Sequence, residues 1–249
     1  MLRSIWTLTW LETKIFLREP MGFIGSVVIP LLLFLGFGRA LGTRLDEATA
    51  QAAIPLRVGL PVFVAVFVAI SAVVSLVAVV AIYRQDGILK RLRATPLSPI
   101  TILVSHVLVK LLMTTATIVG MLLLGRRYYS AGDQVPLVDF TLAVLLSTWS
   151  ILSIGFVIAS LVRTARFAPP LGSLVFYAML PFCGLFAPVD SLPPTMQTVS
   201  AILPLAYAVS LLAGIWQGYP WSAHLSDIAA LSLNFVMCTM VASRVFRWE

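Results

Sequence analysis

The strongest constraint on this sequence is the recurrence of long apolar segments separated by short polar connections. A helix needs about 20 apolar residues to cross the roughly 30 Å hydrocarbon core of a bilayer. Hydrophobic residues make up 60% of the 249 residues and charged residues 11%, whereas soluble domains average about 45–50% and about 25%. The sequence therefore predicts an all-α integral membrane protein with six transmembrane helices. The predicted spans are about 21–41, 58–83, 99–125, 136–162, 167–187 and 223–245, within a single transmembrane domain over residues 21–249.

Residues 1–20 precede the first span and have a different pattern. Trp6 and Trp10 lie on one broad apolar face of a helix, and Lys14 lies on a neighbouring face. Such helices lie in the headgroup region, where tryptophan is favoured. We predict an N-terminal interfacial amphipathic helix, with a simple extension of the first span as the alternative. The internal acidic residues and the lack of a convincing cleavage site argue against a removable signal peptide.

The basic residues indicate how the chain is oriented. The formal net charge is +7, but Lys and Arg are scattered among apolar runs, which argues against nucleic-acid binding. With the N-terminus inside, 11 Lys and Arg fall on the cytoplasmic side and 5 on the outer side, including the Arg126-Arg127 pair. Cytoplasmic loops of multi-pass proteins carry the basic excess. The pattern therefore predicts that both termini are cytoplasmic.

The connection between the second and third spans, residues 83–99, carries the most informative polar sequence. Asp86 and Gly87 can begin a short helix that Pro96 ends, with leucines three residues apart on one of its faces. A short amphipathic helix on a cytoplasmic loop can dock a soluble partner. The alternative is an ordinary basic loop that only sets the topology.

Proline and glycine interrupt the apolar sequence between the fifth and last spans. Residues 195–215 are apolar, but we expect Pro204 and Gly214 to break them into pieces too short to cross a bilayer. We predict an outer re-entrant helical hairpin, which a membrane permits only where protein or water covers its backbone. The alternative, a seventh span, would place the C-terminus outside and contradict the charge pattern.

Ionisable residues within spans need an explanation, because a charge at the bilayer centre costs about 2.5–3.5 kcal/mol on insertion scales. His106 and Lys110 lie one helical turn apart on the third span. They could line a substrate path or contact anionic headgroups, although snorkelling of Lys110 to the cytoplasmic interface is the commoner arrangement. His224 and Asp227, at the outer start of the last span, are interpreted as an interfacial pair.

Taken together, these features resemble the permeases of ABC-2 type transporters over essentially the whole chain. The loop residues that match are Arg84, Asp86, Gly87, Leu89, Leu92, Thr95 and Pro96. The common Glu-Arg opening is replaced by Arg84-Gln85. The run Lys90-Arg91-Leu92-Arg93 is closest to the daunorubicin-resistance-like drug exporter branch. The outer residues that match are Gly184, Pro188, Leu192, Pro193, Pro204 and Tyr207.

The resemblance implies a role for each of these segments. The loop from Arg84 to Pro96, with Lys90, Arg91 and Arg93, would couple the permease to an ATPase. The outer helices would gate the exit of the translocation path. Two permease subunits, identical or related, would pair with two ATPase subunits in the membrane of a bacterial cell.

The sequence contains no G-x-x-x-x-G-K-[ST] phosphate loop and no H-E-x-x-H metal motif. We therefore expect a non-catalytic transport subunit that binds no cofactor itself, with ATP and Mg²⁺ on the partner subunit. The expected cargo is a hydrophobic, drug-like or natural-product substrate leaving the cytoplasm. A lipid-linked glycan or lipid is the alternative cargo, and a non-transporting membrane enzyme or assembly factor is the alternative of another class. Aromatic residues such as Phe63 and Phe67 could contact cargo, but they more often face lipid or pack in a core.

Overall fold

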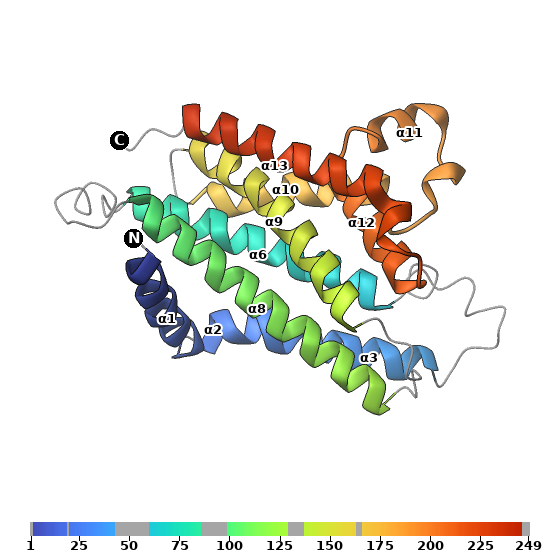
Figure 1. Ribbon diagram of the computed structural model, residues 1–249, viewed down its shortest axis with the longest axis horizontal. Helices are drawn as coiled ribbons and strands as arrows, with labels where there is room; N and C mark the ends of the chain where they lie inside the picture. Colours follow the sequence, from blue (N-terminus) through green and yellow to red (C-terminus); the bar gives the residue numbers. More distant parts are fainter. Residues whose placement is uncertain are drawn as a thin grey trace.

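The computed structural model shows an elongated bundle of helices packed side by side (Figure 1). It describes residues 2–18, 20–42, 60–85, 99–128, 137–162 and 166–245. The helices in chain order are α1 (Leu2–Arg18), α2 (Pro20–Phe23), η1 (Ile24–Val28), α3 (Ile29–Gly42), α6 (Leu60–Gln85), α8 (Pro99–Tyr128), α9 (Leu137–Leu161), α10 (Ala168–Met179), η2 (Leu180–Phe182), η3 (Val189–Ser191), α11 (Pro194–Ser200), α12 (Pro204–Trp216), η4 (Trp221–His224) and α13 (Leu225–Val245). No strand occurs in these ranges, which confirms the all-α prediction for them. The end of the bundle that holds α1 is called the α1 end, and the opposite end the α11 end.

Four helices in the described ranges are long and apolar enough to cross a membrane. They are Val62–Tyr83, Val104–Leu124, Leu137–Leu161 and Trp221–Ala242. They match the second, third, fourth and sixth predicted spans. The first and fifth correspond to shorter apolar helices, Ser26–Gly36 and Ala168–Phe182. The fifth is shorter than the predicted 167–187 because Pro181 has no N–H with which to continue the α-helical ladder. The count of six spans stays a prediction.

Helix α6 lies at the centre of the bundle and packs against α3, α8, α9 and α10. Most of its valines and alanines are buried. Gly155 lets α9 approach closely, because a Cβ atom there would lie 2.8 Å from Cγ1 of Val73. Gly172 of α10 also faces α6, but a Cβ atom there would make an ordinary contact at 3.8 Å with Val77. Small residues at such crossings are typical of membrane helices, whose association depends on close packing rather than on exclusion of water.

The first apolar helix changes geometry near Pro30. The π turn η1 joins α2 to α3 immediately before this proline. Because Pro30 has no N–H, the carbonyl of Ser26 loses its α-helical donor. The hydroxyl of Thr117, on α8, donates to the carbonyl of Met113 in its own helix at 2.8 Å and also lies 3.3 Å from the Ser26 carbonyl. A neighbouring helix thus places a second, longer polar contact beside the carbonyl whose α-helical donor the proline removes.

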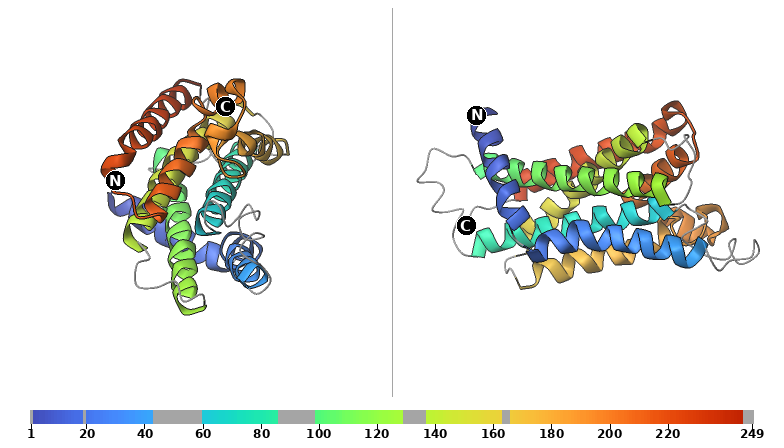
Figure 2. Two further views of the ribbon diagram at one scale, coloured as in Figure 1. Left: turned by 90° about the vertical axis from the view of Figure 1, so that its right-hand side faces the viewer. Right: turned by 90° about the horizontal axis from the view of Figure 1, so that it is seen from below.

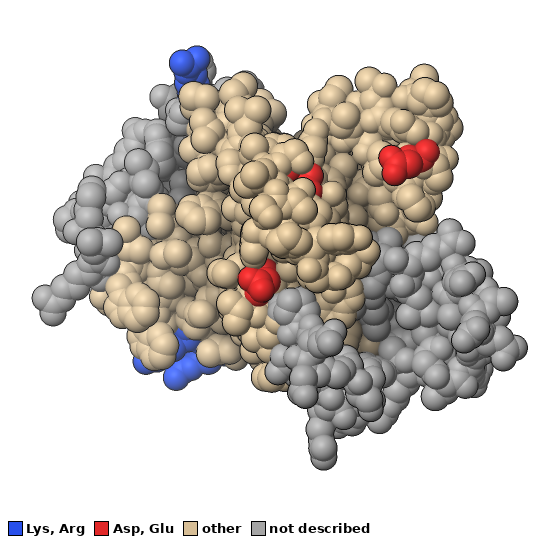
Figure 3. All heavy atoms as spheres, turned by 45° about the vertical axis from the view of Figure 1, so that its right-hand side comes forward, with Lys and Arg blue, Asp and Glu red and all other residues tan. Residues whose placement is uncertain are grey.

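Helix α1 crosses the bundle steeply, whereas the long helices run nearly along it (Figure 2). Charges in the described ranges differ between the two ends. Among the charged residues whose side chains are described, the bases Lys14, Arg18, Lys110, Arg166 and Arg244 and the acid Glu12 lie toward the α1 end, and Asp139, Asp190 and Asp227 lie toward the α11 end. The acidic side chains visible in Figure 3 lie nearer the α11 end than the Lys and Arg side chains do. A basic excess of this kind is expected of a cytoplasmic end, and the cytoplasmic position of the α1 end stays a prediction.

Candidate functional site

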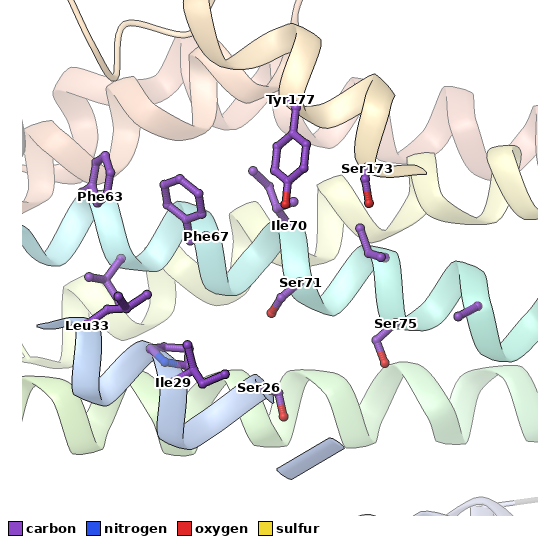
Figure 4. Close-up of a pocket in the computed structure, with 14 residues that line it drawn as sticks. Ser26, Ile29, Leu33, Phe63, Phe67, Ile70, Ser71, Ser75, Ser173 and Tyr177 are labelled. Carbon is purple, nitrogen blue, oxygen red and sulfur yellow. The ribbon is translucent and has the colours of Figure 1, made fainter. Parts of the chain in front are cut away.

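A groove of about 670 Å³ opens between the first apolar helix, α6 and α10 (Figure 4). Its volume lies within the range of roughly 300–1,000 Å³ found for ligand sites. None of the residues that line it is charged. Pro30 and Ser26 belong to its wall, so the proline-altered stretch of the first helix faces this space. The groove can therefore hold an uncharged molecule, or an uncharged part of one.

The lining of the groove changes along its length. One stripe of α6 supplies Phe63, Phe67, Ser71 and Ser75 at four-residue spacing, which places them on the same helix face. Figure 4 shows the phenylalanines in one half and the serines in the other. The half that holds the serines lies toward the α1 end, because α6 runs from the α11 end to the α1 end.

Three further hydroxyl groups border the serine half of the groove, from Ser26, Ser173 and Tyr177. Ser71 donates to the carbonyl of Val68 at 2.9 Å, and Ser173 donates to the carbonyl of Pro169 at 3.0 Å. A hydroxyl oxygen that donates in this way can still accept a hydrogen bond from a ligand. The groove thus has one apolar half and one half with hydrogen-bonding capacity.

A polar junction joins three helices near the α1 end. Nδ1 of His106, on α8, donates to the carboxylate of Glu12, on α1, at 2.6 Å. The other ring nitrogen, Nε2, shares a hydrogen bond of 3.1 Å with the hydroxyl of Tyr83, on α6. The His106 and Glu12 side chains are 10% and 14% exposed, so water screens their interaction weakly. The junction connects α1 to the helices on both sides of residues 86–98.

Lys110 adds a second contact between α8 and α1. Its ammonium group lies 4.5 Å from the ring centroid of Phe16, a distance at which a cation and an aromatic ring attract each other. Lys110 is 7% exposed, and it is not among the residues that line the groove. Both His106 and Lys110 therefore face α1. Ser105 also donates to the carbonyl of Ile5, at 3.4 Å.

The two faces of α1 differ in chemistry. Thr9 and Thr13 are buried on the side that faces α8, and their hydroxyls donate to carbonyls one turn back in the same helix. Trp6 and Trp10 are 74% and 57% exposed on the other side, where Lys14 lies over the Trp10 ring. An outward face of tryptophan and lysine suits the headgroup region of a bilayer.

Most of the predicted coupling loop lies outside the described residues. These positions are Asp86, Gly87, Leu89, Lys90, Arg91, Leu92, Arg93, Thr95 and Pro96. Arg84 belongs to the last turn of α6, and α8 begins at Pro99. Tyr83 lies in the last turn of α6 and His106 lies about two turns after the start of α8, so the Glu12–His106–Tyr83 junction is near both helix ends that flank the loop.

The predicted outer gate residues come together in one compact connection at the α11 end. Gly184 has φ of +82°, a conformation that glycine adopts without strain. Pro188 and Leu192 flank η3, and Pro193 immediately precedes α11. Gln197 donates back to the carbonyl of Leu192 at 2.8 Å, which closes this connection onto α11.

Pro204 and Tyr207 fix the corner between α11 and α12, whose axes differ by 87°. Pro204 begins α12 and leaves Leu203 extended, as the residue before a proline prefers. The hydroxyl of Tyr207 donates to the carbonyl of Ala201, at the end of α11, at 2.6 Å. A broken span and a re-entrant hairpin both have this shape.

The expectation that Gly214 breaks the helix was wrong. Helix α12 continues through it to Trp216. The glycine instead leaves room for the ring of His224, because a Cβ atom at position 214 would lie 1.9 Å from Nε2 of that ring. His224 and Asp227 do form the predicted pair, at 2.8 Å, but Asp227 also accepts a hydrogen bond from Ser210 of α12 at 2.9 Å.

Residues 3–216, from α1 to the end of α12, match the family described as ABC-2 type transporter. This chain belongs to that family. The resemblance inferred from the loop and the outer segment is thereby confirmed, and the ABC-2 type transporters are membrane components of transport systems.

Two relatives of this ABC-2 type transporter are both described as Nodulation protein J. The protein from Neorhizobium galegae is 28% identical over 155 residues, which cover 55% of this chain and 59% of the relative. The protein from Rhizobium leguminosarum bv. viciae is 30% identical over 95 residues, which cover 38% and 37%. The chain thus spans less than two thirds of the length of either relative.

Sequence reasoning missed several residues of this ABC-2 type transporter. Glu12 and Tyr83 were not assigned to His106, since nothing in the sequence shows that three separate helices meet there. The groove serines were also missed. Their signal was present in the four-residue spacing from Phe63 to Ser75, which marks one face of α6.

Proposed function

We propose that this chain is the permease subunit of an ATP-driven exporter whose ATPase is a separate polypeptide. ATP and Mg²⁺ bind to that partner, and this chain has no catalytic role. The single observation that carries the proposal is the Glu12–His106–Tyr83 junction. It makes α1 and the two helix ends beside residues 86–98 one mechanical unit, on which a soluble partner can act.

In this proposal, the ATPase drives the permease because it contacts the permease differently in two conformational states. Closure of the ATPase dimer displaces the loop 84–98, and the junction transfers this displacement to α1, α6 and α8. A driven change requires a partner that binds the two states unequally, and nucleotide-dependent docking on the loop supplies that difference. With the predicted six spans and cytoplasmic termini, the loop and the ATPase would lie on the same side of a bacterial cell membrane. The bacterial sources of the two relatives support this location.

The groove supports a path between two permease subunits. It is not enclosed, and helices that are far apart in the sequence, the first apolar helix, α6 and α10, line it. A second copy, or a related subunit, facing this side would convert the open groove into an enclosed passage. The α11–α12 pair would then act as an outer, re-entrant gate at the exit of the passage.

The uncharged lining favours a hydrophobic or drug-like cargo for this path. A second candidate, a lipid-linked glycan or lipid, is favoured by the hydroxyl groups of Ser71, Ser75 and their neighbours in one half of the groove. An apolar chain would occupy the phenylalanine half, and a hydroxyl-rich segment would occupy the serine half. Both candidates require that the groove accept an apolar molecule.

The proposal is tested by coexpressing the chain with its native ATPase and purifying the complex in lipid nanodiscs. ATP hydrolysis is then measured while apolar drug-like compounds and lipid-linked oligosaccharides are screened. We expect an ATPase to copurify and one class of compound to stimulate hydrolysis several-fold. A chain that is purified without any ATPase, and that changes no cargo, would show instead a membrane enzyme or assembly factor.

A further inference from the structure

Asp227 forms an interaction that joins α12 to α13. It lies in the first turn of α13 and is 7% exposed. Its Oδ2 atom accepts two hydrogen bonds, one from the Ser210 hydroxyl at 2.9 Å and one from Nδ1 of His224 at 2.8 Å. A buried carboxylate is costly unless donors surround it, so these bonds hold both donors in place.

The His224 ring adds a steric element to the same contact. It lies against Gly214, where an added Cβ atom would be 1.9 Å from Nε2 and 2.2 Å from Cε1. Nε2 is buried and has no hydrogen-bond partner among the described residues. The ring is therefore held by the Nδ1 bond to Asp227, by the notch at Gly214 and by an edge contact with the Tyr219 ring, whose centroid lies 6.5 Å away. Ser210 and Gly214 lie one turn apart on α12, so the carboxylate and the ring hold the same helix face.

We propose that Asp227 is a positioning residue that sets the α11–α12 pair against the last span, through Ser210 and the His224 ring in the Gly214 notch. We call these four residues the Asp227 clamp. The corner at Pro204 and Tyr207 makes α11 follow α12, so the clamp controls the position of the whole pair. The role in transport rests on the proposed function, because it takes this pair to be the outer gate.

Asp227 also has a purely local explanation. A carboxylate in the first turn of a helix is stabilised by the helix dipole, whatever it contacts on other helices. Ser210→Ala separates the two explanations, because it leaves the carboxylate in the first turn and removes only the link to α12. Asp139→Ala is the control, because Asp139 lies in the first turn of α9 at the same end and its hydrogen bond, at 3.0 Å, goes to Trp221 of η4 and not to Ser210 or Gly214 of α12.

The clamp is tested by hydrogen exchange of the full chain in nanodiscs without the ATPase. We expect Asp227→Ala and Ser210→Ala to raise exchange of the α11–α12 amides about tenfold or more, since hydrogen bonds to charged groups are the stronger ones. Exchange of α6 and α9 should stay unchanged, and Asp139→Ala should leave α11–α12 unchanged. Unchanged exchange in both clamp variants, or an equal rise throughout the bundle, would overturn the proposal.

Gly214→Ala is a further test, because the two explanations predict opposite changes in the hydrogen-exchange rate of α12. Alanine raises helix propensity, so without the clamp the change should slow exchange of α12. With the clamp, the new Cβ displaces the His224 ring and exchange rises. Gly214→Ala combined with His224→Ala should then exchange no faster than His224→Ala alone, because the ring that clashes is gone. Slower exchange in Gly214→Ala alone would refute the clamp.

Hydrolysis measurements connect the clamp to the gate. In the complex with the ATPase, Ser210→Ala should lower the ratio of cargo-stimulated to basal hydrolysis while copurification is unchanged. A retained ratio alongside raised exchange would overturn the gating role. The exchange data need no ATPase or cargo, so a failure of the exporter proposal is seen separately, as loss of stimulation in the unmodified chain.

Discussion

Nδ1 of His106 donates to the Glu12 carboxylate at 2.6 Å, and this contact joins the N-terminal helix to the third long apolar stretch of the chain. The two residues are 94 positions apart. The sequence alone suggests a separate, local role for each of them. Glu12 reads as one charge of an amphipathic helix, and His106 as a polar residue near a membrane interface. Their contact makes α1 part of the bundle instead of a detached surface helix.

A double-mutant cycle tests this contact. Glu12→Ala and His106→Ala should each lower stability, and together they should destabilise by less than the sum, with a coupling free energy of about 1–2 kcal/mol for a buried polar pair. Thermal unfolding in detergent measures the stability. Lys14→Gln is the control on the exposed face of α1, and it should show no coupling to His106. An additive result for Glu12 and His106 would contradict the junction.

The groove predicts different outcomes for two adjacent residues of α10. Ser173 lines the groove, whereas Leu174 is 65% exposed and is absent from its lining. Ser173→Phe should fill the groove and reduce cargo-stimulated hydrolysis about tenfold or more, while Leu174→Phe should leave it nearly unchanged. Both variants should retain the ATPase on purification. Equal stimulation in both would show that cargo does not use this groove.

Thr117 and Pro30 should depend on each other. Thr117→Val removes the hydroxyl that donates to the Met113 carbonyl at 2.8 Å and lies 3.3 Å from the Ser26 carbonyl. The change should destabilise by about 0.5–1 kcal/mol, a typical value for hydrogen bonds between membrane helices. Pro30→Ala supplies an N–H four residues after Ser26, so the part of the cost of Thr117→Val that comes from the Ser26 contact should disappear in that background. Thr115→Val, whose hydroxyl donates only within α8 to Leu111 at 2.8 Å, is the control. Equal costs of Thr117→Val in both backgrounds would argue against the link.

The two glycines that face α6 should respond differently to alanine. Gly155→Ala places a Cβ atom 2.8 Å from Val73 and should destabilise by about 1–3 kcal/mol through overpacking. Gly172→Ala, with its nearest contact at 3.8 Å, should change stability by less than about 0.5 kcal/mol. Comparison of unfolding midpoints under identical conditions checks this difference. A tolerated Gly155→Ala would mean that α6 and α9 are less tightly packed than their contact indicates.

The sequence could predict the long helices because the thickness of the bilayer sets how many consecutive apolar residues a spanning helix needs. Four of the predicted spans recur with closely similar bounds, and Pro204 does break the outer segment where expected. Predictions from local sequence rules were wrong where a residue elsewhere in the chain determines the local structure. Gly214 looked like a helix breaker, but its lack of a side chain serves the packing of His224, which lies ten residues further along the chain.

The candidate sites were less predictable than the fold, for the same reason. His106 and Lys110 were recognised as unusual within a span, but their contacts with Glu12 and Phe16 depend on how α1 docks against α8. His224 and Asp227 were recognised as a pair, while Ser210 was not assigned to them, since a serine in an apolar helix commonly donates to its own backbone. The sequence held one indication of the groove, the four-residue spacing of Phe63, Phe67, Ser71 and Ser75. Only the positions of the neighbouring helices show that this face of α6 borders a space.

We propose that a separate ATPase drives this permease through the loop between α6 and α8. The most direct test of this proposal is the amount of ATPase that copurifies with a chain in which Lys90, Arg91 and Arg93 are all changed to Glu. Arg166→Glu combined with Arg244→Glu is the control for charge at the same end of the bundle. We predict that the loop variant inserts normally but loses the ATPase, while the control retains it. Unchanged copurification, with unchanged cargo-stimulated hydrolysis in the loop variant, would contradict the account.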